Sequence, residues 1–246
     1  MLTTAPLQPH LARCDAGIAH IDLGRPEAGN ILTRQHMGAL VDALAAAGAD
    51  PATHVVAIGA QGPAFCLGRD GKGEVPEALP WDARQKQMGA TLDLYDAIAA
   101  CPLPVVALVH GDAIGLGAAL AGACDITLAS DTAKFALPEI RHSIPATLAI
   151  SALLHKLPAK ALAHLVYSAE TISAEEALGL GLVSKVYPHD QFAAGTAGYL
   201  AELSGRKRLV LETIKRYFGK ARQLSPDMAA EYAGALMALV KPSLQG

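Results

Sequence analysis

The chain has 246 residues, of which 52% are hydrophobic and 17% charged, and its formal net charge is -3. A chain of this length buries roughly 70–75% of its unfolded surface, so its stability requires neither disulfides nor a structural metal. The small net charge, without a dense basic patch, argues against nucleic acid as a partner. The longest uncharged apolar run, residues 113–124, is shorter than the about 20 residues that cross a bilayer, so no membrane partner is expected.

The first part of the chain reads as short strands around one helix. Strands are predicted at 17–23 and 55–59, and an alanine-rich helix at 33–47 lies between them with Thr33 as its N-cap. Glycines and prolines crowd residues 68–80, which predicts an exposed, mobile loop.

A helix is predicted next at 81–100, followed by strands at 105–109 and 125–129. The continuous apolar and β-branched run at 105–109 is typical of a buried parallel strand. Because strands alternate with helices, the pattern predicts an α/β fold with parallel crossovers.

From residue 147 onward the pattern is almost entirely helical. Ser173 opens an S-A-E-E capping box, and the short helix that it begins should end near Gly179 or Gly181. A last helix is predicted at 226–240, with an apolar stripe that indicates core or interface. The stripe consists of Met228, Tyr232, Ala235, Leu236 and Leu239.

Two glycine-containing turns follow predicted strands. Residues 62–70 form the first, where backbone N–H groups can point into a crevice without obstruction by side chains. Residues 105–120 read as strand, glycine-rich turn and helix, which aims the first N–H groups of a helix at one point that can hold an anion. A dinucleotide site is disfavoured, because the Gly115-x-Gly117 pattern ends in Leu120 and lacks an acid at the required distance.

A third segment, residues 134–145, places Glu139 among apolar side chains. Partial desolvation would raise its pKa and make it a proton acceptor and donor near neutral pH. From this segment alone, a surface glutamate or one paired with Arg141 is an equally good interpretation. The neighbouring His110 and His142 are interpreted as structural residues, and no ligand spacing predicts a metal site.

Cysteine usage and the N-terminus bear on the compartment. Cys14, Cys66, Cys101 and Cys124 are too far apart for zinc or redox pairs, so reduced structural thiols are expected. Residues 1–10 carry neither positive charge nor a sustained apolar stretch, unlike a secretory signal. These features favour a cytoplasmic location.

Together the segments resemble the crotonase (enoyl-CoA hydratase/isomerase) family. Residues 62–70 resemble its A-F-x-x-G-x-D turn, residues 111–125 its G-x-x-x-G-x-G segment ending in C-D, and residues 137–139 its catalytic P-E. Residues 25–32 resemble its R-P-x-x-x-N-A-L segment, and residues 173–183 its A-x-x-A-x-x-x-G-L-V segment. All five matches occur in the family's order.

The resemblance implies a crotonase-like ββα superhelix at residues 1–188 and a C-terminal helical trimerisation region at residues 189–246. It implies a homotrimer or a dimer of trimers. It also implies an acyl-CoA thioester enzyme that stabilises an enolate, with coenzyme A bound as part of the substrate and no separate cofactor.

Carried onto this sequence, the resemblance makes the backbone N–H groups of Arg69 and Leu116 the oxyanion donors and Glu139 the acid/base. Further residues are expected to bind the coenzyme A thioester. These are Ala28, Gly29, Ile31, Cys66, Gly68, Asp70, Gly115 and Lys215.

Departures from the family pattern affect the reaction. Ala119 stands where family hydratases place a second glutamate, and a double-bond shift needs only one base, so isomerase is favoured over hydratase. Hydration stays open if Glu74, Glu77 or Asp82 supplies the missing carboxylate. A non-catalytic acyl-CoA-binding protein is the third interpretation.

Two further departures concern binding. Glu27 occupies a position where the family often has a basic residue near the coenzyme A phosphates, and Lys215 could compensate. After Pro145 the chain continues with Ala146, Thr147 and Leu148 instead of a run of glycines, so the acyl group is not predicted.

Overall fold

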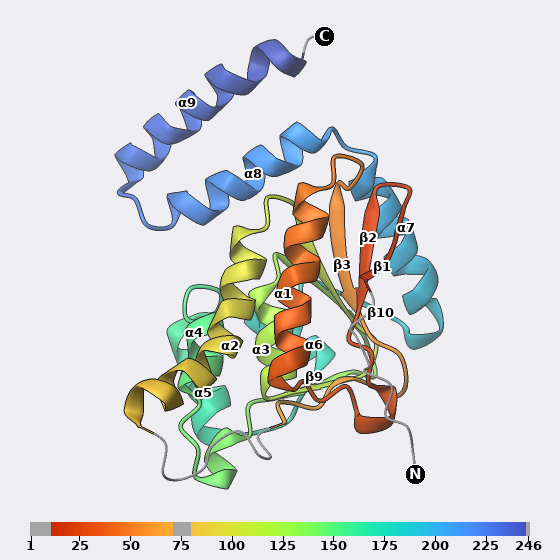
Figure 1. Cartoon of the computed structure of the whole chain (residues 1–246), viewed down its shortest axis with the longest axis vertical. Helices are drawn as coiled ribbons and strands as arrows, with labels where there is room; N and C mark the ends of the chain where they lie inside the picture. The colour runs from red at the N-terminus through yellow and green to blue at the C-terminus, as the bar shows by residue number, and fades with distance from the viewer. Residues whose placement is uncertain (1–10, 71–79, 245–246) are drawn as a thin grey trace.

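The computed structural model describes residues 11–70 and 80–244 (Figure 1). Its strands are β1 (Leu11–Asp15), β2 (Ile18–Asp22), β3 (Val55–Gly59), β4 (Ala64–Cys66), β5 (Val105–Val109), β6 (Asp112–Ile114), β7 (Ile126–Ser130), β8 (Lys134–Ala136), β9 (Ile172–Ser173) and β10 (Lys185–Tyr187). Its α-helices are α1 (Arg34–Ala49), α2 (Trp81–Ala100), α3 (Leu116–Ala123), α4 (Thr147–Leu153), α5 (Ala159–Ser168), α6 (Ala174–Leu180), α7 (Phe192–Ser204), α8 (Arg208–Ala221) and α9 (Pro226–Leu244). Three short 3-10 helices are η1 (Pro26–Ala28), η2 (Glu139–His142) and η3 (His189–Gln191).

The strands form two sheets. One has six strands in the order β1-β2-β3-β5-β7-β10, and the other has four in the order β4-β6-β8-β9. The neighbours pair in parallel except β1 with β2 and β8 with β9. The chain passes from the first sheet to the second in β3–β4, β5–β6 and β7–β8, and α2 and α3 follow the first two passages. This repetition is the predicted ββα superhelix.

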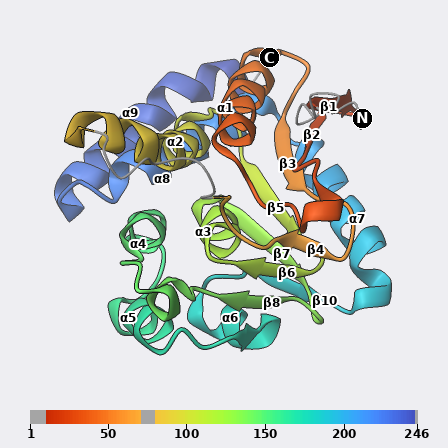
Figure 2. The same cartoon turned by 60° about the horizontal axis from the view of Figure 1, so that its bottom comes forward.

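The main core lies between the sheets and the helices α1, α2 and α3 (Figure 2). Val105, Val106 and Val109 of β5 are fully buried, as the β-branched run predicted. A second apolar cluster joins the six-stranded sheet to Leu200 of α7 and Leu211 of α8. Both faces of the large sheet are therefore covered, which is usual for parallel sheets.

Several predicted elements have the bounds that the sequence indicated, namely β3, β5 and α2. The predicted Thr33 cap of α1 accepts a hydrogen bond from the His36 N–H at 3.3 Å. The Ser173 capping box is also present at the start of α6, and that helix ends at Gly181 with a left-handed φ of 84°. Most of the predicted loop at 68–80 lies outside the described residues.

Helices α8 and α9 extend beyond the sheet-containing body and lie against each other (Figure 1). In the predicted stripe of α9, Leu236 is buried, whereas Met228 and Leu239 are 55% and 72% exposed. The stripe therefore leaves apolar side chains on the surface of the single chain. No helix among the described residues is long and apolar enough to span a membrane.

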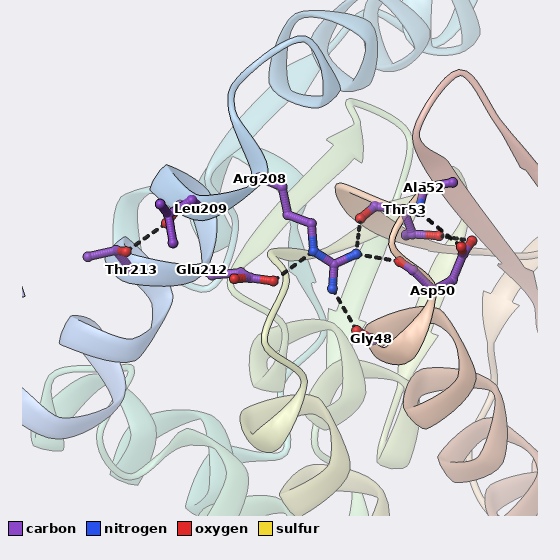
Figure 3. Close-up of polar contacts among 8 residues, drawn as sticks. All are labelled: Gly48, Asp50, Ala52, Thr53, Arg208, Leu209, Glu212 and Thr213. Atoms are coloured by element: carbon purple, nitrogen blue, oxygen red, sulfur yellow. Dashed lines mark hydrogen bonds and ion pairs between the residues drawn. The ribbon is translucent and has the colours of Figure 1, made fainter. Parts of the chain in front are cut away.

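Arg208 fixes the first turn of α8 to the body (Figure 3). Its guanidinium donates to the carbonyl oxygens of Gly48 at 2.7 Å and Thr53 at 2.6 Å, and also to that of Asp50. Its Nε atom bonds the Glu212 carboxylate at 2.7 Å. Because the carbonyls belong to the C-terminal end of α1 and the turn after it, a cation there is favoured by both hydrogen bonding and the helix dipole.

Lys215 makes a second anchor about two turns further along the same face of α8. Its side chain is 9% exposed, and its ammonium donates to the Ile98 and Leu103 carbonyls at 2.8 and 3.0 Å. It also bonds the Asp125 carboxylate at 2.7 Å. We call Arg208 and Lys215 with these partners the α8 clamp, because both cations hold α8 to the ends of body helices.

Candidate active site

The turn after β4 is braced by the segment before α1. Backbone hydrogen bonds run from Leu67 to Gly29 at 2.9 Å, from Leu32 to Gly68 at 3.0 Å and from Asp70 to Leu32 at 2.9 Å. The predicted binding residues Gly29, Gly68 and Asp70 are thus brought together. Glycine is favoured at position 29, because its φ of +62° is left-handed and a Cβ atom there would require the Leu67 side chain to move.

This bracing determines where the Arg69 N–H points. Gly68 and Asp70 both bond Leu32, and backbone groups alternate from side to side along an extended segment. The Arg69 N–H is therefore directed away from Leu32, toward the side of β6, with which β4 is paired. Neighbouring Asn30 is fully buried and donates to the Gln61 and Ala64 carbonyls at 2.9 and 2.8 Å, which holds the whole turn in place.

The start of α3 supplies the second predicted donor. Gly115 adopts φ 55° and ψ -116° immediately before Leu116, a conformation that favours glycine. A Cβ atom on Gly117 would overlap the Cys66 carbonyl oxygen, so this glycine allows α3 to contact the backbone of β4. The Leu116 N–H is one of the first N–H groups of the helix, which have no intrahelical acceptor. No described residue accepts a hydrogen bond from it.

Glu139 begins the 3-10 helix η2, which follows strand β8. In the small sheet, β8 pairs with β6, the strand that leads into the Gly115 turn. A Cβ atom built on Gly115 would lie 3.4 Å from Glu139 Oε1, so the carboxylate lies against the glycine turn that precedes α3. Its Oε2 atom is buried and has no hydrogen-bond partner among the described residues. A buried acceptor without a partner is unusual and points to a group that a ligand completes.

Burial is the main cause that raises the pKa of Glu139 above its ordinary value. Its own backbone N–H and the nearby His142 oppose the shift and lower the pKa. No second carboxylate acts on Glu139 among the described residues. The site therefore contains one partly desolvated carboxyl group, suited to accepting and returning a proton.

Ala119 is fully buried on α3, so the position that matches the family's second glutamate contributes no polar group. Asp82 is exposed in the first turn of α2, and Glu74 and Glu77 lie outside the described residues. His110 bonds the Gly62 carbonyl at 2.8 Å, in keeping with its structural interpretation.

The remaining predicted binding residues divide into two places. Ala28 and Ile31 are partly buried within residues 25–32, the segment that braces the turn after β4. Burial raises the pKa of the Cys66 thiol to about 12, which keeps it protonated. Lys215, in contrast, lies on the wall of a cavity of about 560 Å³ that none of Arg69, Leu116 and Glu139 lines. Its ammonium already has three acceptors, which it would have to give up to bind a phosphate. Its role in coenzyme A binding stays a prediction.

One residue near the site was missed from the sequence. Tyr95 of α2 is 9% exposed, and Glu139, Cys66 and Arg69 are close enough to act electrostatically on its hydroxyl. In the sequence Tyr95 is one member of an apolar helix face together with Leu94 and Ile98, both fully or almost fully buried. A phenol on an otherwise aliphatic stripe was the available signal.

Comparison with known proteins agrees with this geometry. Residues 13–240 match the sequence model of the family described as Enoyl-CoA hydratase/isomerase. The mitochondrial enoyl-CoA hydratase domain-containing protein 3 of Mus musculus is 32% identical over 224 residues, which cover 91% of this chain and 74% of that protein. The probable enoyl-CoA hydratase echA8 of Mycobacterium bovis is 34% identical over 213 residues, which cover 85% of this chain and 81% of that protein.

Among solved structures, human enoyl-CoA hydratase domain-containing protein 3 superposes with a TM-score of 0.88 at 29% identity, covering 94% of this chain and 90% of that one. The fold and the position of the two glycine turns define an acyl-CoA enzyme of the crotonase type. The chain belongs to the enoyl-CoA hydratase/isomerase family, as the motif resemblance predicted.

Proposed function

We propose that the protein stabilises the enolate of an acyl-CoA thioester and shifts the position of a carbon–carbon double bond, with Glu139 as the single base. The observation that supports this proposal most strongly is the buried, unpartnered Oε2 atom of Glu139 beside the Gly115 turn. The Arg69 and Leu116 N–H groups bond the thioester oxygen, on which negative charge develops. Donors of this kind are typically worth about 2.7–4 kcal/mol each in the transition state.

The proposed reaction starts from an enoyl thioester whose double bond lies between C3 and C4. Glu139 removes a proton from C2, and the electron pair spreads over C2, C4 and the thioester oxygen. The same carboxyl group returns the proton to C4, so the double bond moves into conjugation with the thioester. One carboxyl group whose pKa is raised by desolvation suffices for both transfers.

Coenzyme A enters only as part of the substrate in this proposal. Residues of the segment before α1, of the turn after β4 and of the turn before α3 hold the thioester end of the substrate. These are Ala28, Gly29, Ile31, Cys66, Gly68, Asp70 and Gly115.

Hydration of a 2-enoyl-CoA is the second candidate function, and the names of the similar proteins favour it, because all three of those described above have hydratase in their names. Hydration generally uses two carboxylates, whereas Ala119 is buried and apolar and no second carboxylate acts on Glu139. A carboxylate from Glu74, Glu77 or Asp82 would have to complete the site.

A panel of linear, branched and cyclic enoyl-CoA thioesters with mass detection separates the two reactions. Isomerisation converts a 3-enoyl-CoA into a conjugated product of the same mass, whereas hydration adds the mass of one water to a 2-enoyl-CoA. Water addition that depends on Glu74, Glu77 or Asp82 would overturn the isomerase proposal. Binding of the thioesters without any turnover would instead indicate an acyl-CoA-binding protein.

The protein is expected to assemble as a homotrimer or a dimer of trimers. Apolar side chains left exposed on α8 and α9 support this expectation, among them Phe218 at 59% and Leu239 at 72% exposure. A monodisperse monomer in light scattering would contradict it.

A further inference from the structure

The side chain of Asn30 joins the segment before α1 to the turn that leads into β4. Its Nδ2 atom donates to the carbonyl oxygens of Gln61 at 2.9 Å and Ala64 at 2.8 Å, at the two ends of that turn. Its Oδ1 atom accepts a hydrogen bond from the Arg25 N–H at 3.0 Å. Because Asn30 is fully buried, water cannot take over these three hydrogen bonds, and losing the side chain would leave its partners unpaired.

The backbone of Asn30 also has a conformation that few residue types adopt. Its φ is +54°, in the left-handed region, which glycine tolerates best and asparagine and aspartate tolerate next. Glycine has no side chain to reach the two carbonyl oxygens. An ionised aspartate only accepts hydrogen bonds, so it would repel both oxygens. Of the residue types that suit this φ, only asparagine also satisfies the buried carbonyls.

Leu32, two residues further on, extends this connection to the proposed donor of Arg69. Leu32 and Arg69 form an isolated parallel β-bridge. In this bridge the Leu32 N–H donates to the Gly68 carbonyl at 3.0 Å, and the Leu32 carbonyl accepts from the Asp70 N–H at 2.9 Å. The peptide groups on both sides of Arg69 are therefore fixed by the segment that the Asn30 side chain holds against the start of β4.

We propose that Asn30 is a positioning residue whose side chain sets the direction of the Arg69 N–H, and thereby how strongly the site polarises a thioester carbonyl. The inference rests on the proposed function, because it takes this N–H as one of the two oxyanion donors. Asn30 acts through the backbone of residues 67–70, without contact to the substrate. Its loss should therefore weaken stabilisation of the transition state more than binding of the ground state.

The carbonyl stretching frequency of a bound thioester measures this polarisation. Butyryl-CoA is the probe, because it has no double bond to shift, and the infrared difference between ligand with and without ¹³C at the carbonyl isolates the carbonyl band. We expect binding to the wild-type protein to lower the frequency, because both N–H groups draw electron density onto the oxygen. Asn30→Gly keeps the left-handed backbone and removes the side chain, so the bound carbonyl should return toward the frequency of the free ligand.

Turnover of a 3-enoyl-CoA gives a second readout for the same variant. In Asn30→Gly it should fall about 10- to 100-fold, because small displacements of a catalytic group have effects of this order. The dissociation constant of butyryl-CoA should rise by a smaller factor, because ground-state binding depends less on the direction of one N–H. A loss of the same factor in both quantities would contradict a positioning role.

Gly62→Ala disturbs the same junction from the opposite side and keeps the proposal testable if Asn30→Gly does not fold. A Cβ atom on Gly62 would lie 2.8 Å from the Pro26 Cβ atom, so the substitution should push the two segments apart. We expect it to reduce the frequency shift as well. Thermal unfolding shows which variants remain folded.

Thr196→Val is the matched control, because it removes a buried hydrogen bond in α7, which packs on the large sheet. Thr196 is 4% exposed and donates to the Phe192 carbonyl at 2.8 Å. This variant should lose stability and keep the wild-type frequency. An unchanged frequency in the folded Asn30 and Gly62 variants, or an equal change in the control, would overturn the role of Asn30. Butyryl-CoA that fails to bind the wild-type protein, or that binds at the frequency of the free ligand, would overturn the proposed function.

Discussion

The α8 clamp and the candidate active site both contain buried polar groups, but these groups have hydrogen-bond partners in the clamp and lack one in the site. In the clamp, Arg208 reaches three carbonyls and one carboxylate, and Lys215 reaches two carbonyls and one carboxylate. In the site, the buried Glu139 Oε2 atom has no partner among the described residues. A satisfied buried group contributes to stability, whereas an unsatisfied one lowers it and needs another reason to be present.

The strongest test of this contrast is Glu139→Gln. We expect turnover to fall roughly 10²- to 10⁴-fold, because the variant lacks the proton-transferring group. The measurement is deuterium exchange at C2 of a bound thioester. In the wild-type protein, exchange should decline as the pH falls through the raised pKa of Glu139, since only the ionised carboxylate accepts a proton. Undiminished exchange in the variant would remove Glu139 from the mechanism.

The same variant should be more stable than the wild type at neutral pH. A raised folded-state pKa means that the stability from protonated Glu139 is fully present below its unfolded-state pKa and is lost as pH rises through the folded-state value. Glutamine is neutral at every pH, so the variant does not bury a charge at neutral pH and avoids this loss of stability. A variant with lower thermal stability would show that the carboxylate has a structural partner.

The next largest effect is expected for Leu116→Pro, which tests the backbone N–H group of Leu116. Proline is compatible with the first residue of a helix but lacks the N–H, so turnover should fall about 10²- to 10³-fold with little loss of secondary structure. Leu116→Met is the control, because it keeps the N–H and usually costs less than about 1.5 kcal/mol in the core. Equal turnover in the two variants would contradict the role of this N–H group.

The smallest expected effect concerns the clamp, and two arginines close together in the sequence provide the comparison. Arg208→Met should lower the free energy of unfolding by about 2–4 kcal/mol, because it leaves the Glu212 carboxylate and the α1 carbonyls without their donor. Arg206→Met should cost less than about 1 kcal/mol, because its pair with Glu202 is exposed at 60% and 74%. Urea unfolding measures both, and similar losses would refute the distinction.

The long elements of the fold could be predicted from local sequence. The apolar run of β5 and the prolines that follow α2 determine those bounds without tertiary information. The strands β4, β6 and β8 have three residues each, too few for a two-residue period to be recognised, and they exist because neighbouring strands pair with them. These strands were therefore absent from the elements predicted by local pattern, and the ββα superhelix was expected only from the family resemblance.

Candidate site residues could be named from the sequence where they belong to contiguous motifs, whereas neighbours that depend on packing were missed. The glycines around Leu116 and the Leu137-Pro138-Glu139 segment are local signals that motif comparison detects. Tyr95 comes within electrostatic reach of Glu139 only in the folded chain, where α2 packs against α3 and α4, and Lys215 is engaged by acceptors from three other segments. Neither relation has a signature in the linear sequence.

That the two proposed oxyanion donors belong to peptide bonds has a consequence for engineering. Every residue type except proline supplies the same N–H group, so randomising the side chains at positions 69 and 116 cannot delete the donors. A library without proline at position 69, and with apolar residues at position 116 because Leu116 is packed in the main core, would leave the electrophilic end of the substrate held in the same way. Side-chain changes at these positions are thus separable from the activation of the thioester.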